Sequence, residues 1–135
     1  MKVAVRYFSK TGNTKKIADA IAKEAGVDAA PVSQPLAEDV DILFLGAYVM
    51  AGGVTKEVKN FVKDINVSVG EVVSFSTHGI NGSTYGTVKK LVESKGISMS
   101  DKEFNSKGSF KVLHKSRPNN DDLNEAKAFA KKIIG

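Results

Sequence analysis

The sequence has 135 residues, of which 41% are hydrophobic, and a formal net charge of +5. This length provides one sizeable hydrophobic core, so we expect a single domain spanning residues 1–135. The absence of cysteine excludes disulfides, thiolate metal sites, iron–sulfur clusters and cysteine nucleophiles, so any redox chemistry requires a bound cofactor.

The hydrophobic runs are short. The first residues, MKVAVRYFSK, contain an apolar run too short for a signal peptide. No stretch approaches the roughly 20 apolar residues of a membrane-spanning helix. We therefore expect a cytoplasmic protein with no membrane partner.

Strands and helices are expected to alternate along the chain, as in a parallel sheet covered on both faces. The sequence predicts a strand at Lys2–Phe8 and an amphipathic helix at Asn13–Ala25, which Gly26 ends. A short strand is expected at Val27–Ser33. The nearly continuous apolar run Asp41–Ala47 is typical of a central strand buried on both faces.

The connection between the second and third strands is unusually short. Only the seven residues QPLAEDV separate Ser33 from Asp41. Because a parallel crossover usually takes a dozen residues or more, we expect its helix to be abbreviated or absent.

The second half of the chain continues the alternation. Helices are predicted at Thr55–Ile65 and Ser83–Lys95, with a strand between them at Glu71–Thr77. Ile97–Phe104 is expected to form the last strand, at an edge of the sheet.

A final helix is expected near the carboxyl end, with Asn119 or Asn120 as its cap. Its apolar residues recur at helical spacing and are predicted to face the core: Leu123, Ala126, Phe129, Ala130, Ile133 and Ile134.

The junction between the first strand and the first helix has the sequence SKTGNT, residues 9–14. Ser9, Thr11 and Thr14 supply hydroxyl groups, Gly12 permits close backbone approach, and Asn13 can cap the helix. Such a loop at the amino end of a helix suits a phosphate. It lacks the GxxxxGK[ST] and GxGxxG spacings. The same residues would also suit a well-capped junction that binds nothing.

The SKTGNT segment fits the [ST]-x-T-G-x-T phosphate loop of the flavodoxins, and the order of elements resembles that family over most of the chain. The sequence looks like a short-chain flavodoxin. This resemblance implies an α/β fold of the flavodoxin-like three-layer α/β/α type. Its five-stranded parallel sheet would have the order 2-1-3-4-5, with an abbreviated crossover between strands 2 and 3.

The resemblance also implies flavin mononucleotide (FMN) as cofactor, bound by three loops at the carboxyl ends of the strands. The implied phosphate-loop residues are Ser9, Lys10, Thr11, Gly12, Asn13 and Thr14, with Lys10 as an extra cation. The implied flavin-ring residues in the first ring loop are Ala47, Tyr48, Val49, Met50, Ala51 and Gly52. Those in the second ring loop are Thr77, His78, Gly79, Ile80, Asn81, Gly82 and Tyr85.

The ring loops depart from the family pattern. Met50 lies where some flavodoxins place a methionine or a tryptophan against the ring, but it could instead fill the core, with Tyr48 as the contact. Flavodoxins usually place an aromatic residue near the glycine of the second ring loop, followed by acidic residues. Here Ile80 follows Gly79, so His78 or Tyr85 would supply any stacking.

The implied function is that of an FMN-binding electron carrier between redox proteins, without a substrate of its own. Two alternatives remain open: a flavodoxin-like binding or regulatory module with weak or lost FMN affinity, and a flavodoxin that activates ribonucleotide reductase. An enzyme acting on a small substrate is less favoured, because the sequence shows no paired carboxylates or nucleophile–base set.

A basic segment spans residues 102–117. It contains Lys102, Lys107, Lys111, Lys115 and Arg117 against the single acidic residue Glu103. This segment either attracts an acidic redox partner protein or is a solvated loop. No nucleic-acid-binding signature accompanies it, so we do not expect a nucleic acid partner. We expect a monomer.

Overall fold

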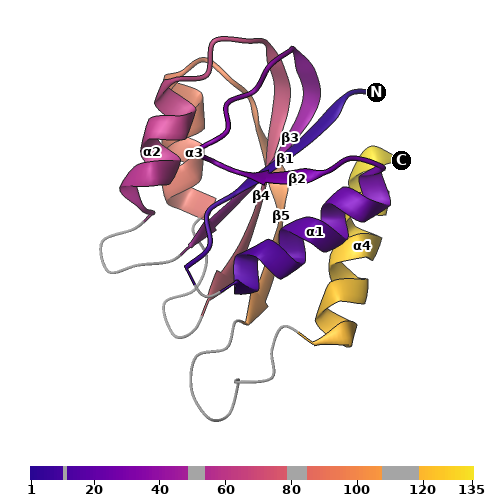
Figure 1. Cartoon of the computed structure of the whole chain (residues 1–135). Coiled ribbons are helices and arrows are strands. Elements are labelled where there is room, and N and C mark those ends of the chain that lie inside the picture. The colour runs from indigo at the N-terminus through magenta and orange to yellow at the C-terminus, as the bar shows by residue number, and fades with distance from the viewer. Residues whose placement is uncertain (11, 49–53, 79–84, 108–118) are drawn as a thin grey trace.

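The computed structural model describes residues 1–10, 12–48, 54–78, 85–107 and 119–135 (Figure 1). Five strands form one parallel sheet of order β2-β1-β3-β4-β5. The strands are β1 (Val3–Tyr7), β2 (Ala29–Pro31), β3 (Val40–Tyr48), β4 (Val69–His78) and β5 (Met99–Lys107). The helices in the described part are α1 (Asn13–Ala25), α2 (Lys56–Lys63), α3 (Tyr85–Ser94) and α4 (Asn120–Ile134). The predicted α/β fold class and strand order are confirmed.

The helices cover the sheet on both faces (Figure 1). Strand β3 lies between β1 and β4, and its residues 42–47 are all buried, as its continuous apolar run predicts. One face of the sheet forms a core with α1 and α4, in which Ile17, Ile21 and Phe75 are fully buried. The other face forms a core with α2 and α3, in which Val58 and Val88 are fully buried.

Strand β2 is shorter than the predicted Val27–Ser33. Helix α1 ends at Gly26, which has a φ of 74°, and the N–H of Val27 donates to the carbonyl of Ala22. Residue 27 therefore completes the helix terminus rather than the strand. A turn then follows directly, because the N–H of Gln34 donates to the carbonyl of Pro31.

The β2–β3 connection, residues 32–39, contains no helix, as its length predicts. Instead, Val32 and Leu36 reach the core on the α2 side, where each is only 8% exposed. The guanidinium of Arg6 on β1 donates to the carbonyls of Gln34 and Pro35 within the connection. The sheet is thus covered at this point by an irregular segment that side chains fix in place.

Helix α4 begins at the predicted cap. The Asn119 side chain accepts from the N–H of Asp122 at 3.1 Å, and the Asp122 carboxylate accepts from the N–H of Asn119 at 2.9 Å. This reciprocal pair is a capping box. Phe129 of α4 contacts Phe104 of β5, with ring centroids 5.7 Å apart, which anchors the helix on the sheet. The predicted core-facing residues of this helix all pack in the core shared with α1.

Within the ranges that the structure describes, no helix has the length and apolar character needed to span a bilayer.

Candidate functional site

Strands β1, β3 and β4 end at the same edge of the sheet (Figure 1). Tyr7, the last residue of β1, pairs with Gly46, whereas Tyr48 at the end of β3 pairs with Thr77 of β4. Strand β3 therefore extends two residues, or roughly 6–7 Å, beyond β1. The segment after β1 begins at a step beside the two longer strands.

The step depends on a glycine in β3. A Cβ atom on Gly46 would lie 2.4 Å from ring carbons of Phe75 on β4. Phe75 is fully buried against α1 and α4, so its ring cannot easily withdraw. Only glycine at position 46 lets β3 and β4 pair closely where the site begins.

The β1–α1 junction, residues 8–12, holds a defined turn. The hydroxyl oxygen of Ser9 accepts from the N–H of Gly12 at 2.9 Å. Gly12 has a φ of 89° and is the N-cap of α1, whose first intrahelical bond runs from the N–H of Lys16 to the Gly12 carbonyl at 3.1 Å. As a glycine, this N-cap has no side chain with which to cap the helix. The N-cap residue itself therefore offers no side-chain acceptor to the first-turn N–H groups, as Ser, Thr, Asp or Asn would at this position.

The electrostatics of this junction favour an anion. The first turn of α1 carries no acidic residue, so no carboxylate of that turn offsets the positive end of the helix dipole. The space beside the Cα of Gly12 is open: apart from its two chain neighbours, no described residue has an atom within 4 Å of where a Cβ would lie. Lys10 is exposed beside it. These features fit a phosphate group.

Two polar residues follow Gly12 at the start of α1. Asn13 is 7% exposed and Thr14 is fully buried, so both are held by their surroundings. Lys15 is exposed and donates to Asp19 at 2.8 Å, and this hydrogen bond raises the pKa of the Lys15 ammonium. Asp19 therefore holds this lysine along the outer surface of α1.

The structure places only part of the predicted flavin-ring set. Thr11, Val49, Met50, Ala51, Gly52 and residues 79–82 lie outside the described residues. Tyr48, Thr77 and His78 occupy the ends of β3 and β4. Ala47 is fully buried in the core on the α2 side, so a contact from this residue would come from its backbone.

Tyr85, the first residue of α3, is half-buried, and its hydroxyl donates to the carbonyl of Ser100 at 2.7 Å. Ser100 lies where the β4–β5 register shifts, between the pairs Val72–Met99 and Ser74–Glu103. The tyrosine thus ties α3 to an irregular part of β5. Its role in contacting a flavin ring stays a prediction.

A cavity of about 320 Å³ borders the β1–α1 junction, and the sequence did not predict it. Its walls come from β1, Ser9, the end of β2, the β2–β3 connection and the first turn of α2. Glu57 is its charged lining residue. These segments are far apart in the sequence, so no local pattern could have indicated the cavity.

Residues 4–107 match the family model described as a flavodoxin domain. The chain is 30% identical to an uncharacterized protein of Methanocaldococcus jannaschii over 148 aligned positions, covering 99% of each chain.

Solved structures of flavodoxins have the same fold. A flavodoxin from the domain Archaea superposes with a TM-score of 0.75 at 19% identity, covering 98% of this chain and 96% of that one. Oxidised flavodoxin 1 from Bacillus cereus superposes with a TM-score of 0.72 at 16% identity, covering 99% of this chain and 97% of that one. Together with the family match over most of the sequence, this shows that the chain belongs to the flavodoxin family.

Proposed function

We propose that this protein binds FMN and carries electrons between redox proteins. The observation that carries the proposal is the amino end of α1, which lies directly after β1 and begins at Gly12, an N-cap with a positive φ and no side chain of its own. A phosphate monoester would accept hydrogen bonds from backbone N–H groups at this helix end. When bound, the flavin supplies reversible electron transfer.

The protein's own residues would bind and orient the cofactor. Ser9 shapes the turn after β1, residues 9–12, which we call the phosphate turn, because its hydroxyl accepts from the N–H of Gly12. Tyr48 and Thr77 lie level with each other on neighbouring strands, so the carboxyl ends of β3 and β4 lie side by side. This arrangement supports one ligand that contacts the turn after β1 and both later segments.

A comparison of FMN with riboflavin tests the proposal, because the two ligands differ in the phosphate. The purified protein is expected to show flavin absorption bands or to take up one FMN per chain in a fluorescence-quenching titration. Riboflavin is expected to bind at least about tenfold more weakly, since charge-assisted hydrogen bonds to the phosphate are lost. A colourless protein that does not bind micromolar FMN would overturn the carrier function and favour a binding module. Equal affinity for both ligands would overturn the phosphate assignment.

We further propose that the basic segment 102–117 docks an acidic redox partner protein. Lys102 is exposed, and Lys111, Lys115 and Arg117 lie outside the described residues. An acidic partner would be attracted over about 8 Å at physiological ionic strength. The rate of electron transfer to an acidic ferredoxin-type acceptor is therefore expected to fall as salt rises. The triple variant Lys107→Gln, Lys111→Gln, Lys115→Gln should flatten that dependence, and an unchanged slope would contradict the assignment.

A further inference from the structure

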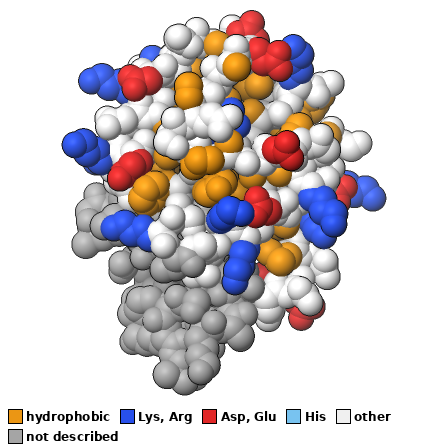
Figure 2. Space-filling model, viewed as in Figure 1, with side chains coloured by type: hydrophobic (Ala, Val, Ile, Leu, Met, Phe, Trp, Pro, Cys, Tyr) orange, Lys and Arg blue, Asp and Glu red, His pale blue; other side chains and the backbone are white. Residues whose placement is uncertain are grey.

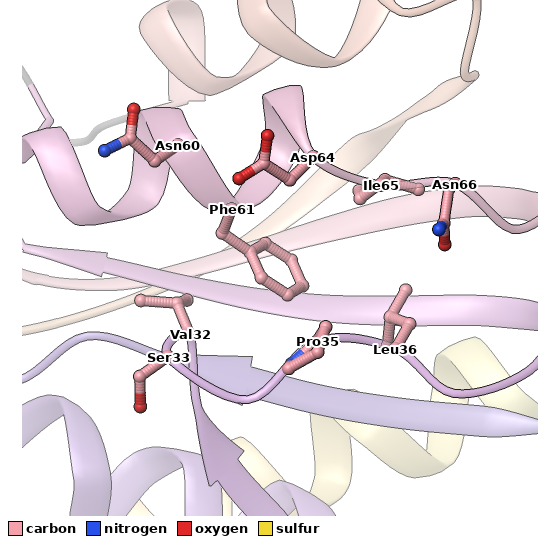
Figure 3. Close-up of a pocket in the computed structure, with 9 residues that line it drawn as sticks. All are labelled: Val32, Ser33, Pro35, Leu36, Asn60, Phe61, Asp64, Ile65 and Asn66. Carbon is pink, nitrogen blue, oxygen red and sulfur yellow. The ribbon is translucent and has the colours of Figure 1, made fainter.

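A groove runs between α2 and the β2–β3 connection. It consists of two cavities, of about 310 and 320 Å³, which share Val32 and Ser33 in their walls. One cavity lies beside Asn60 and Phe61 of α2 and the residues 64–66 that follow the helix (Figure 3). The other lies beside Glu57, in the first turn of α2. The groove thus follows the whole length of this helix.

The groove exists because the connection is too short to form a helix. Figure 3 shows the ring of Phe61 pointing from α2 toward the connection, where Val32 and Pro35 lie. The space-filling view shows hydrophobic side chains gathered on the middle of this face, between α2 and α1 (Figure 2). The floor of the groove is therefore apolar, and its apolar residues also belong to the core on the α2 side: Val32, Leu36, Phe61 and Ile65.

The charged side chains that line the groove are both acidic. Glu57 lies in the first turn of α2, and Asp64 is the residue at its carboxyl cap. They are seven residues apart, so they lie on one side of the helix, about 10 Å apart along its axis. Both are exposed, and neither forms an ion pair with any residue that the structure describes. The chain as a whole has a charge of +5, so this acidic edge stands out against a basic molecule.

The polar groups of the groove rim include two amides. Asn60 lies on α2 between the two carboxylates, and Asn66 lies just beyond the end of the helix. The lysines of α2, at positions 56, 59 and 63, fall on the helix surface turned away from Phe61 at helical periodicity. The rim facing the connection can therefore pair with cations and with backbone groups of a ligand.

We infer that this groove docks a helix of a partner protein that carries lysine or arginine at positions seven residues apart, with apolar side chains between them. The two basic groups would meet Glu57 and Asp64, and the apolar side chains would enter the two cavities. Charge complementarity selects this partner over an acidic one. None of the described lining residues belongs to the basic segment 102–117. Ser9 of the turn after β1 lines the cavity beside Glu57, but the inference does not depend on FMN binding.

A peptide titration followed by amide chemical shifts tests the inference. The probe is a synthetic helical peptide with two lysines seven residues apart and leucines between them, and its control has glutamates in place of the lysines. The lysine peptide is expected to shift the amide signals of Ser33, Asn60 and Asn66. The glutamate peptide is expected to leave them unchanged. Equal binding of both peptides, or shifts confined to Gly12 and Asn13 at the phosphate turn, would overturn the inference.

Matched variants locate the contact. The double variant Glu57→Gln, Asp64→Asn should weaken binding of the lysine peptide by up to about tenfold, because two partly exposed ion pairs are lost. Lys56→Gln and Lys59→Gln, on the other surface of the same helix, should leave the affinity unchanged or slightly higher. Unchanged affinity in the double variant would overturn the inference. Sedimentation velocity tests whether the groove instead binds a second copy of the chain. Self-association that Asp64→Asn abolishes would overturn the partner assignment in favour of that dimer.

Discussion

The guanidinium of Arg6 holds the backbone of Gln34, with Nε donating to the Gln34 carbonyl at 2.9 Å. The same group donates to the carbonyls of Pro35 at 3.3 Å and Val5 at 3.1 Å. Partial burial lowers the pKa of the Arg6 guanidinium. A planar group with several fixed donors can bind these carbonyls together, which suits it to fix a connection that has no helical hydrogen bonds of its own.

Replacing Arg6 should therefore destabilise the fold through the connection. Arg6→Met is expected to lower the free energy of unfolding by about 1–3 kcal/mol, because three carbonyl acceptors lose a charged donor. Arg6→Lys should recover part of that loss, since one ammonium group cannot bind all three carbonyls. Urea denaturation of the protein measures both.

Glu38→Gln is the matched control in the same connection. Glu38 pairs with Lys2 at 3.0 Å, but both side chains are more than 60% exposed, so the loss should stay below about 1 kcal/mol. An Arg6→Met loss no larger than that of Glu38→Gln would show that the guanidinium does not fix the connection.

The sequence was sufficient to predict the main elements because their signals are local. The apolar spacing of Ile17, Ala18 and Ile21 marks α1, whose predicted and observed bounds coincide at Asn13–Ala25. The continuous apolar run in β3 likewise predicted its central place. Contacts between residues far apart in the sequence have no such local signal. In the sequence, Arg6 merely interrupts the apolar run of a strand. No periodic pattern links it to its acceptors, which lie 28 and 29 residues later.

The candidate site was predictable in part for the same reason. The turn after β1 is a contiguous motif, so its glycine and its place at the amino end of α1 could be predicted from a few residues. By contrast, the need for glycine at position 46 comes from Phe75, and Tyr85 is bound to Ser100, fifteen residues away. Contacts of this kind depend on the strand register, which could not be predicted from the sequence.

The conformation of Gly12 gives a second prediction. Its φ of 89° lies in the left-handed region, so Gly12→Ala should destabilise the protein by about 1 kcal/mol or more, although open space surrounds the position. Gly86 lies within α3 without a positive φ and has equally open surroundings. Gly86→Ala should therefore stabilise the protein by up to about 1 kcal/mol. Thermal unfolding compares the two variants, and shifts of the same sign would contradict this account.

The capping box of α4 gives a third prediction. Asn119→Ala removes the acceptor for the N–H of Asp122 and should lower the free energy of unfolding by about 1 kcal/mol. Asp122→Ala should have a similar effect, and the double variant should cost less than the sum of the two, because the bonds are reciprocal. Additive losses in urea denaturation would show that the two bonds act independently.

Ser9 gives a prediction that rests on the proposed function. Its hydroxyl accepts from the N–H of Gly12, so Ser9→Ala should loosen the phosphate turn and weaken FMN binding by about 1 kcal/mol. Ser9→Thr keeps the hydroxyl and should retain most of the affinity. Binding of riboflavin, which lacks the phosphate, should not change in Ser9→Ala. Ser68→Ala, beside the amino end of β4, is a suitable control, and an equal loss there would exclude a local role for Ser9.

The contact between Gly46 and Phe75 provides the last prediction. Gly46→Ala places a methyl group 2.4 Å from the Phe75 ring, within a core that cannot expand freely, and should cost about 1–3 kcal/mol of unfolding free energy. Phe75→Leu alone should also destabilise the protein, since it removes part of a fully buried ring. In the double variant the smaller side chain leaves room for the new methyl group. Its loss should therefore fall short of the sum of the two single losses by at least about 0.5 kcal/mol. Urea denaturation of the four proteins gives this coupling directly, and strictly additive losses would mean that β3 and β4 separate to accommodate the methyl group without the ring moving.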